Sequence, residues 1–188
     1  LKLGLSRAPV VIRDEPDDLK AFLFVFYENL AGREFPLLEK AEIVSKLQAF
    51  GMAKSRIMKD ILPLLQIPPT AFYLESFLSL SRLGFSAKKA ISEKNLPFPI
   101  ARLLAEFQVE DLEKIIPLLL PLGQNKQKEV LEDLLEISRR DNIPPREILE
   151  APGIQAVLHS SKWPPVQKSE RIRLALRPLL VVTPTERI

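Results

Sequence analysis

Three consecutive segments decide the fold: PLLEKAEIVSKLQAFG (residues 36–51), MAKSRIMKDILPLLQIPPT (52–70) and AFYLESFLSLSRLG (71–84). In each of them apolar residues recur at the spacing of one helix face. Pro36 suits a first helical turn, and Gly51 suits the end of the same helix. The Pro68–Pro69 pair ends the second helix because proline has no amide hydrogen to donate. The segments therefore predict three helices with short connections, the layout of a helix-turn-helix unit.

A helix-turn-helix layout has two interpretations. Most three-helix units in all-α proteins serve only to pack against their neighbours, and a fold alone does not establish a function. One interpretation of this unit is DNA binding. The other is a helical module that packs against its neighbours or interacts with another protein. The remaining segments are also helical in pattern, so we predict a mainly α fold with this unit as its core and a helical bundle after it.

Composition narrows the possible functions. The 188 residues include 27 basic and 24 acidic side chains, and this net charge of +3 permits an anionic partner without requiring one. The chain has no cysteine and one histidine, which excludes disulfides, thiolate chemistry and a usual zinc site. No apolar run reaches the roughly 20 residues of a membrane span. We expect a cytoplasmic protein, and the start at Leu1 without a methionine leads us to expect a longer parent.

Two features precede the three segments. Val10–Arg13 is a short β-branched run that predicts a strand left from a truncated α/β domain. A predicted helix then ends in a polar cluster of Glu28, Asn29 and Arg33. One interpretation is a local cap in which Arg33 pairs with Glu28 or Glu34. The other is a site for phosphate and a divalent metal, with oxygen ligands for Mg²⁺ and a guanidinium for phosphate.

Several motifs in this order resemble the ParB family of chromosome and plasmid partition proteins. They are Gly4–Leu5, Ala8–Asp14, Glu28–Leu30 with the nearby Arg33, the helix-turn-helix, Ile91–Leu96 and Ala101–Leu104. The resemblance covers roughly residues 1 to 150. It implies a protein that binds duplex DNA as a homodimer on the nucleoid, away from membranes, and that can work with a ParA-like ATPase.

The resemblance also implies a nucleotide site. Glu28 and Asn29 would be metal-side ligands, and Arg33 a phosphate contact, for CTP and Mg²⁺ in the full-length parent. The parent would bind CTP and hydrolyse it weakly, whereas we expect no catalysis and no cofactor in this fragment. Arg33 stands one position later than the family's arginine. The family's glycine-glutamate-arginine-arginine turn would lie before Leu1.

The predicted DNA contacts lie in the second and third helices and just beyond them. The family usually has glycine, then lysine or serine, and arginine before its recognition helix, whereas this chain has Ile67–Tyr73 there. The third helix therefore has few groups suited to base edges, and we expect mainly phosphate contacts. For the basic residues the alternative is an ordinary solvated face. The predicted contacts are Lys54, Arg56, Lys59, Thr70, Tyr73, Arg82, Lys88 and Lys89.

Three domains follow from these patterns. Residues 1–34 would end a ParB-like nucleotide domain, residues 35–150 would form the helix-turn-helix domain with its support, and residues 151–188 would be a basic helical segment. The break at Ala151–Gly153 precedes a change of charge. The predicted function is duplex DNA binding of the partition type. The alternatives are a protein-interaction module that has lost DNA reading and, less strongly supported, nucleotide hydrolysis or nuclease activity.

Overall fold

The computed structural model describes residues 17–181, and all regular secondary structure in this range is helical. The prediction of a mainly α fold is thereby confirmed, while the strand predicted at Val10–Arg13 lies outside the described residues. In chain order the elements are α1 (Asp18–Leu30), α2 (Leu37–Ala49), α3 (Lys54–Arg56), the π-helical turn η1 (Ile57–Ile61), α4 (Ala71–Ser81), α5 (Phe85–Glu93), α6 (Phe98–Leu104), α7 (Val109–Leu119), α8 (Gln124–Asp141), α9 (Pro145–Ile148), α10 (Pro152–Leu158) and α11 (Pro165–Val181).

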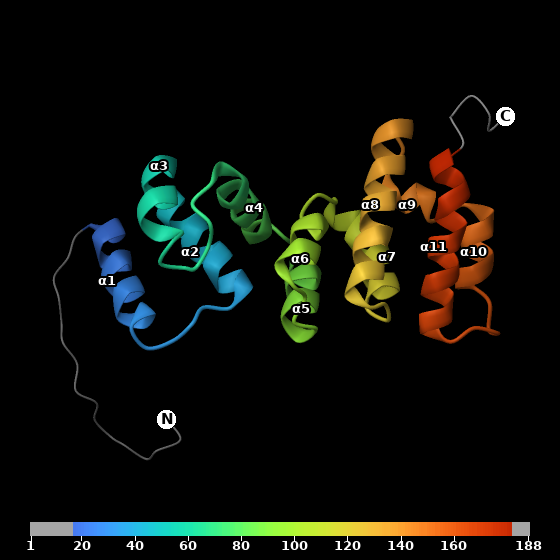
Figure 1. Ribbon diagram of the computed structural model, residues 1–188, viewed down its shortest axis with the longest axis horizontal. Helices are drawn as coiled ribbons and strands as arrows, with labels where there is room; N and C mark the ends of the chain where they lie inside the picture. Colours follow the sequence, from blue (N-terminus) through green and yellow to red (C-terminus); the bar gives the residue numbers. More distant parts are fainter. Residues whose placement is uncertain (1–16, 182–188) are drawn as a thin grey trace, which may run out of the picture.

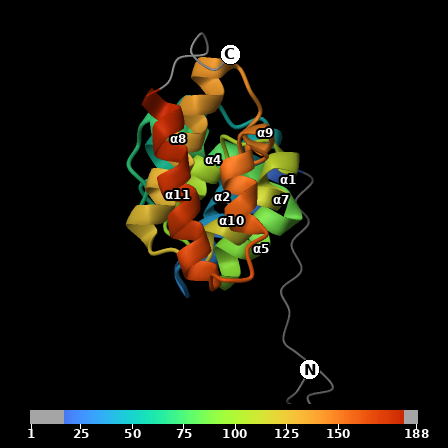
Figure 2. The same cartoon turned by 90° about the vertical axis from the view of Figure 1, so that its right-hand side faces the viewer.

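The helices follow one another along the long axis of the molecule in nearly the order of the chain. Helices α1 to α4 lie at one end, α5 and α6 in the middle, and α10 and α11 at the far end (Figure 1). Seen from that far end, α10 and α11 stand side by side in front of the other helices (Figure 2). Helix α6 contacts both α4 and α8, so it connects the first half of the molecule to the second.

The three helices predicted between Pro36 and Gly84 are present and contact one another. Helix α2 packs against α4, and η1 packs against both. Leu47, Ile57 and Leu74 are fully buried where these helices meet. The apolar spacing of the sequence thus provides the shared interior of this three-helix unit.

Three helix ends in the first half share one form of cap. Gly51, Gln66 and Asn95 have positive φ angles of 87°, 58° and 47°. In each case the next residue donates its amide to the carbonyl five positions earlier, as in Ile67 to Leu62 at 2.9 Å. That next residue is apolar and buried. These are Schellman caps, in which a buried side chain after the helix fixes the direction of the following turn.

The second helix is less regular than its sequence predicted. Its middle part, η1, is wound as a π-turn, and the amide of Leu62 bonds to the carbonyl of Ile57. The wide turn directly precedes Pro63, whose ring would clash with the Lys59 carbonyl in a regular α-helix. The chain then ends this helix at Gln66, before Pro68, as predicted.

One apolar core runs through the described chain. Its buried side chains extend from Phe26 in α1 to Leu176 in α11, across both predicted domain boundaries. The division into domains therefore stays a prediction. Among residues 17–181, no helix combines the length and the apolar character needed to span a bilayer.

Candidate nucleic-acid interface

Helix α4 presents one side to solvent. We call this side the outer face of α4; its side chains are Ala71, Phe72, Glu75, Ser79 and Arg82. The opposite side of α4, with Leu74 and Phe77, is buried. The hydroxyl of Thr70, itself exposed, accepts the Tyr73 amide at 3.5 Å and caps the first turn. The third helix of the unit therefore has a free face, as a helix must have to enter a DNA groove.

Two neighbouring aromatic residues on α4 have different surroundings. Tyr73, a predicted DNA contact, is half-buried, and its ring stacks on that of Phe98 with centroids 5.3 Å apart. Phe72, which the apolar spacing of residues 71–83 assigned to the apolar side of the helix, is instead 56% exposed on the outer face. The spacing by four of Ala71, Glu75 and Ser79 is the sequence signal for this face, because these small or polar residues interrupt an otherwise apolar helix.

Positive charge is concentrated around this unit. Residues 54–94 contain seven lysines and arginines and three acidic residues, whereas the rest of the chain has 20 basic and 21 acidic residues. The second helix, α4 and α5 thus form one of two basic stretches; the other is residues 151–188, with six basic and two acidic side chains. A polyanion would find its favourable electrostatic partner in this part of the molecule.

Three of the predicted basic residues form exposed ion pairs. Lys54 lies 2.6 Å from Glu75, Arg56 lies 3.5 Å from Asp60, and Lys89 lies 3.9 Å from Glu93. Such surface pairs usually contribute no more than about 1 kcal/mol. Their cations can therefore exchange a carboxylate for a phosphate at small cost.

Lys59 and Arg82 have no ion pair or side-chain hydrogen bond with any described residue, and both are exposed. Arg82 closes the outer face of α4 at its C-terminal end. Both side chains are available for phosphate without breaking an existing contact.

Lys88 has a different setting from its neighbour Lys89. Its half-buried ammonium donates to Glu42 Oε1 at 2.6 Å and to the carbonyl of Ser81 at 2.7 Å. These bonds tie α5 to α2 and to the end of α4. In this arrangement Lys88 holds the unit together, and its role as a DNA contact stays a prediction.

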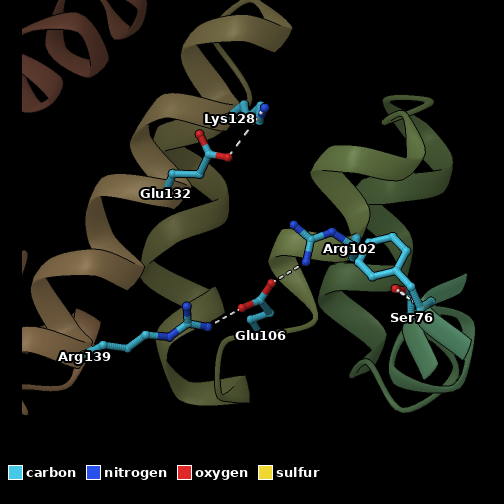
Figure 3. Close-up of polar contacts among 7 residues, drawn as sticks. Ser76, Arg102, Glu106, Lys128, Glu132 and Arg139 are labelled. Carbon is cyan, nitrogen blue, oxygen red and sulfur yellow. Dashed lines mark hydrogen bonds and ion pairs between the residues drawn. The ribbon is translucent and has the colours of Figure 1, made fainter.

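A hollow of about 370 Å³ lies beside the outer face of α4, between this helix and α6. Its α6 wall includes Arg102 and Glu106, whose side chains are paired at 2.6 Å. The other oxygen of Glu106 pairs with Arg139 of α8, so one carboxylate serves two guanidinium groups (Figure 3). The Arg102 guanidinium also lies 5.6 Å from the ring centre of Phe72. The four-residue spacing of Arg102 and Glu106 was the available sequence signal for this network.

A separate pocket lies between α1 and α2. Asn29 and Arg33 both line this pocket, and Glu28 is exposed outside it. The Arg33 guanidinium is paired with Glu39 of α2 at 2.7 Å. The predicted cap with Glu28 or Glu34 is therefore wrong: the turn after α1 directs Arg33 across to the first turn of α2. The Asn29 amide group donates to the Val25 carbonyl at 2.8 Å.

Of the three residues predicted for a nucleotide and metal, Asn29 and Arg33 share this pocket and Glu28 does not. The pocket has a volume of about 190 Å³ and walls that are mostly aromatic or aliphatic. Small-molecule sites usually begin at about 300 Å³. Within residues 17–181, no three side chains of the metal-binding types are grouped to hold a metal ion. The roles of Glu28, Asn29 and Arg33 toward CTP and Mg²⁺ stay a prediction.

Comparisons with models of known protein families, with curated proteins and with solved structures found no match.

Proposed function

We propose that this chain binds duplex DNA through the unit formed by α2, α3–η1 and α4, in the manner of a ParB-type partition protein. One observation carries the proposal. Residues 54–94 contain seven basic and three acidic side chains, and the same stretch holds the free outer face of α4.

Phosphate contacts supply most of the binding in this proposal. A duplex carries one negative charge for about every 1.7 Å of its axis. Lys59 and Arg82 meet phosphates directly, and Lys54, Arg56 and Lys89 do so after leaving their exposed carboxylates. Such contacts give affinity and set the orientation of the protein on the duplex, without selecting a sequence.

The wider partition role rests on the resemblance of residues 1 to 150 to the ParB family. By that resemblance the protein acts as a homodimer on the nucleoid, with a ParA-like ATPase as a partner. By the same resemblance CTP and Mg²⁺ belong to this proposal, and they have no part in the DNA contacts described here.

A protein-interaction module is the second candidate function. Phe72 is 56% exposed at the centre of the hollow between α4 and α6, and exposed aromatic residues are frequent anchors at protein interfaces. Glu75, on the same face, would repel a phosphate. In this second function the outer face of α4 packs against another protein, and the charge of residues 54–94 has no specific ligand.

Charge reversal distinguishes the two functions. The test variant is Lys59→Glu with Arg82→Glu, and the control is Lys20→Glu with Lys162→Glu, which makes the same change in net charge at two exposed positions outside residues 54–94. Binding to a fluorescent mixed-sequence duplex is measured by anisotropy at fixed salt. We expect affinity to fall about tenfold or more in the test variant and by less than about twofold in the control. Equal losses in both, or no binding by the unchanged protein, would contradict the proposal.

A further inference from the structure

The first two turns of α4 carry an unusual set of side chains for a helix that enters DNA. Going along the outer face, the groups are the hydroxyl and methyl of Thr70, the methyl of Ala71, the ring of Phe72 and the carboxylate of Glu75. Arginine and lysine recognise guanine, and asparagine and glutamine recognise adenine. None of these four residue types occurs between Thr70 and Ser81. Apart from the Thr70 hydroxyl, which can donate as well as accept, the available chemistry is apolar contact and hydrogen-bond acceptance.

Each of these two kinds of chemistry has a pyrimidine partner in the major groove. The 5-methyl group of thymine is the apolar feature of that groove, and phenylalanine and alanine pack against it. The 4-amino group of cytosine is a donor, and glutamate accepts its hydrogen bond. The first two turns of this face are therefore suited to pyrimidines and have no arginine, lysine, asparagine or glutamine for purines.

Phe72 is held in place from one side while much of its surface stays open. The Arg102 guanidinium lies 5.6 Å from its ring centre, and Tyr73 meets it edge-on at 5.2 Å. Arg102 is itself fixed by Glu106, which Arg139 holds from α8 (Figure 3). A ring that is already ordered loses little conformational entropy when it meets a methyl group.

The Glu75 side chain is also held in place before any DNA binds. Its Oε1 accepts a hydrogen bond from the Lys54 ammonium at 2.6 Å, and its Oε2 has no hydrogen bond with any described residue. More than half of the side chain is exposed. The nearby ammonium offsets part of the repulsion between this carboxylate and the phosphates.

We propose that the outer face of α4 reads pyrimidines, with Phe72 packed on the methyl group of a thymine and Glu75 accepting from the amino group of a nearby cytosine. The inference rests on the duplex binding proposed above. Residues three apart on a helix have Cβ atoms about 5–6 Å apart. Successive bases of one strand are separated by about 3.4 Å along the axis. The two pyrimidines are therefore one or two base steps apart.

Uracil substitution tests the thymine contact. Duplexes that the full chain retains from a randomised pool are sequenced, and each thymine of the enriched site is then replaced by deoxyuridine, which lacks only the 5-methyl group. At one position we expect affinity to fall about fourfold, the value of one buried methyl group. Phe72→Ala abolishes this difference. Phe85→Ala removes a ring that is 82% exposed on α5 and leaves the difference intact.

Glu75→Gln tests the cytosine contact in the same selection. Glutamine pairs with adenine through two hydrogen bonds. The position that the unchanged protein fills with cytosine becomes adenine in the sites that this variant enriches. Circular dichroism shows whether each exposed-site variant keeps the helical content of the unchanged protein.

The outcomes separate this inference from the proposed function. Binding without any enriched sequence, or an enriched site with no uracil-sensitive position, overturns pyrimidine reading and leaves duplex binding intact. A uracil effect that persists in Phe72→Ala also overturns the assignment to Phe72. No binding to any duplex overturns both proposals.

Discussion

Gln66 adopts a backbone conformation that ordinarily favours glycine. Its φ is 58°, at the point where the second helix ends and the chain turns toward Pro68. An ordinary L-residue in the left-handed region carries a cost of roughly 1–2 kcal/mol. The burial of Ile67 and its hydrogen bond to Leu62 hold the turn in place against this cost.

Replacing Gln66 by glycine is expected to stabilise the fold. Relief of the strain exceeds the entropy that glycine adds to the unfolded chain, so the free energy of unfolding rises by about 0.5–1 kcal/mol. Asn95→Gly is the matched control, since asparagine tolerates the left-handed region better. Urea unfolding measures both variants. A loss of stability in Gln66→Gly, or an equal gain in the two variants, would show that the conformation of Gln66 is not strained.

The sequence alone identified some of these residues and missed others for a physical reason. Gly51 was recognisable as a helix end because glycine is the usual residue there. Gln66 was not, because burial of the following isoleucine selects its conformation. The sequence also did not show which of the two residues, Phe72 or Tyr73, is exposed. Both are aromatic, and only the position of Phe98 on α6 decides that the tyrosine turns inward.

Among the helices, α8 contains an acidic residue in an unfavourable setting. Burial raises the pKa of Asp133, and the neighbouring Glu129 and Glu136 raise the pKa further, while Arg177 and Arg173 of α11 lower it. Because the folded-state pKa lies above the unfolded one, the charged carboxylate destabilises the fold at neutral pH. As the pH falls through the raised pKa, the folded state takes up the proton first and this penalty disappears.

Asp133→Asn should therefore stabilise the protein at pH 7 and give little advantage near pH 4. The gain at pH 7 should stay below about 1 kcal/mol, since the side chain is partly exposed and solvent screens its charge. Thermal unfolding of both proteins across this range provides the comparison. A difference that does not change with pH would show that the charge of Asp133 is not its cause.

In the whole molecule, each helix is determined by residues close together in the sequence. The arrangement of the helices is determined by contacts between residues far apart. Apolar spacing and proline breaks predicted the three-helix unit, because each helix depends on residues close together in the chain. Contacts such as Lys88 with Glu42 and Arg139 with Glu106 join residues 46 and 33 positions apart. No local pattern specifies such pairs, so the hollow beside α4 and the network behind it could only be found in three dimensions.

The arrangement separates two regions of different charge. Residues 54–94, with seven basic and three acidic side chains, lie in the first half of the row of helices, and residues 95–150 that follow have seven basic and eleven acidic side chains (Figure 1). A duplex bound along the first half would leave the second half free for other contacts. This division of roles between the two halves follows from the proposal that residues 54–94 contact phosphates.

The salt dependence of duplex binding by the unchanged chain tests this proposal most directly. Each neutralised phosphate contributes about −0.9 to the slope of log K against log salt concentration. The five phosphate contacts proposed from residues 54–94 predict a slope of about −4 to −5 for each bound chain. A slope shallower than about −1, or no measurable binding at low salt, would contradict the assignment of this surface to DNA.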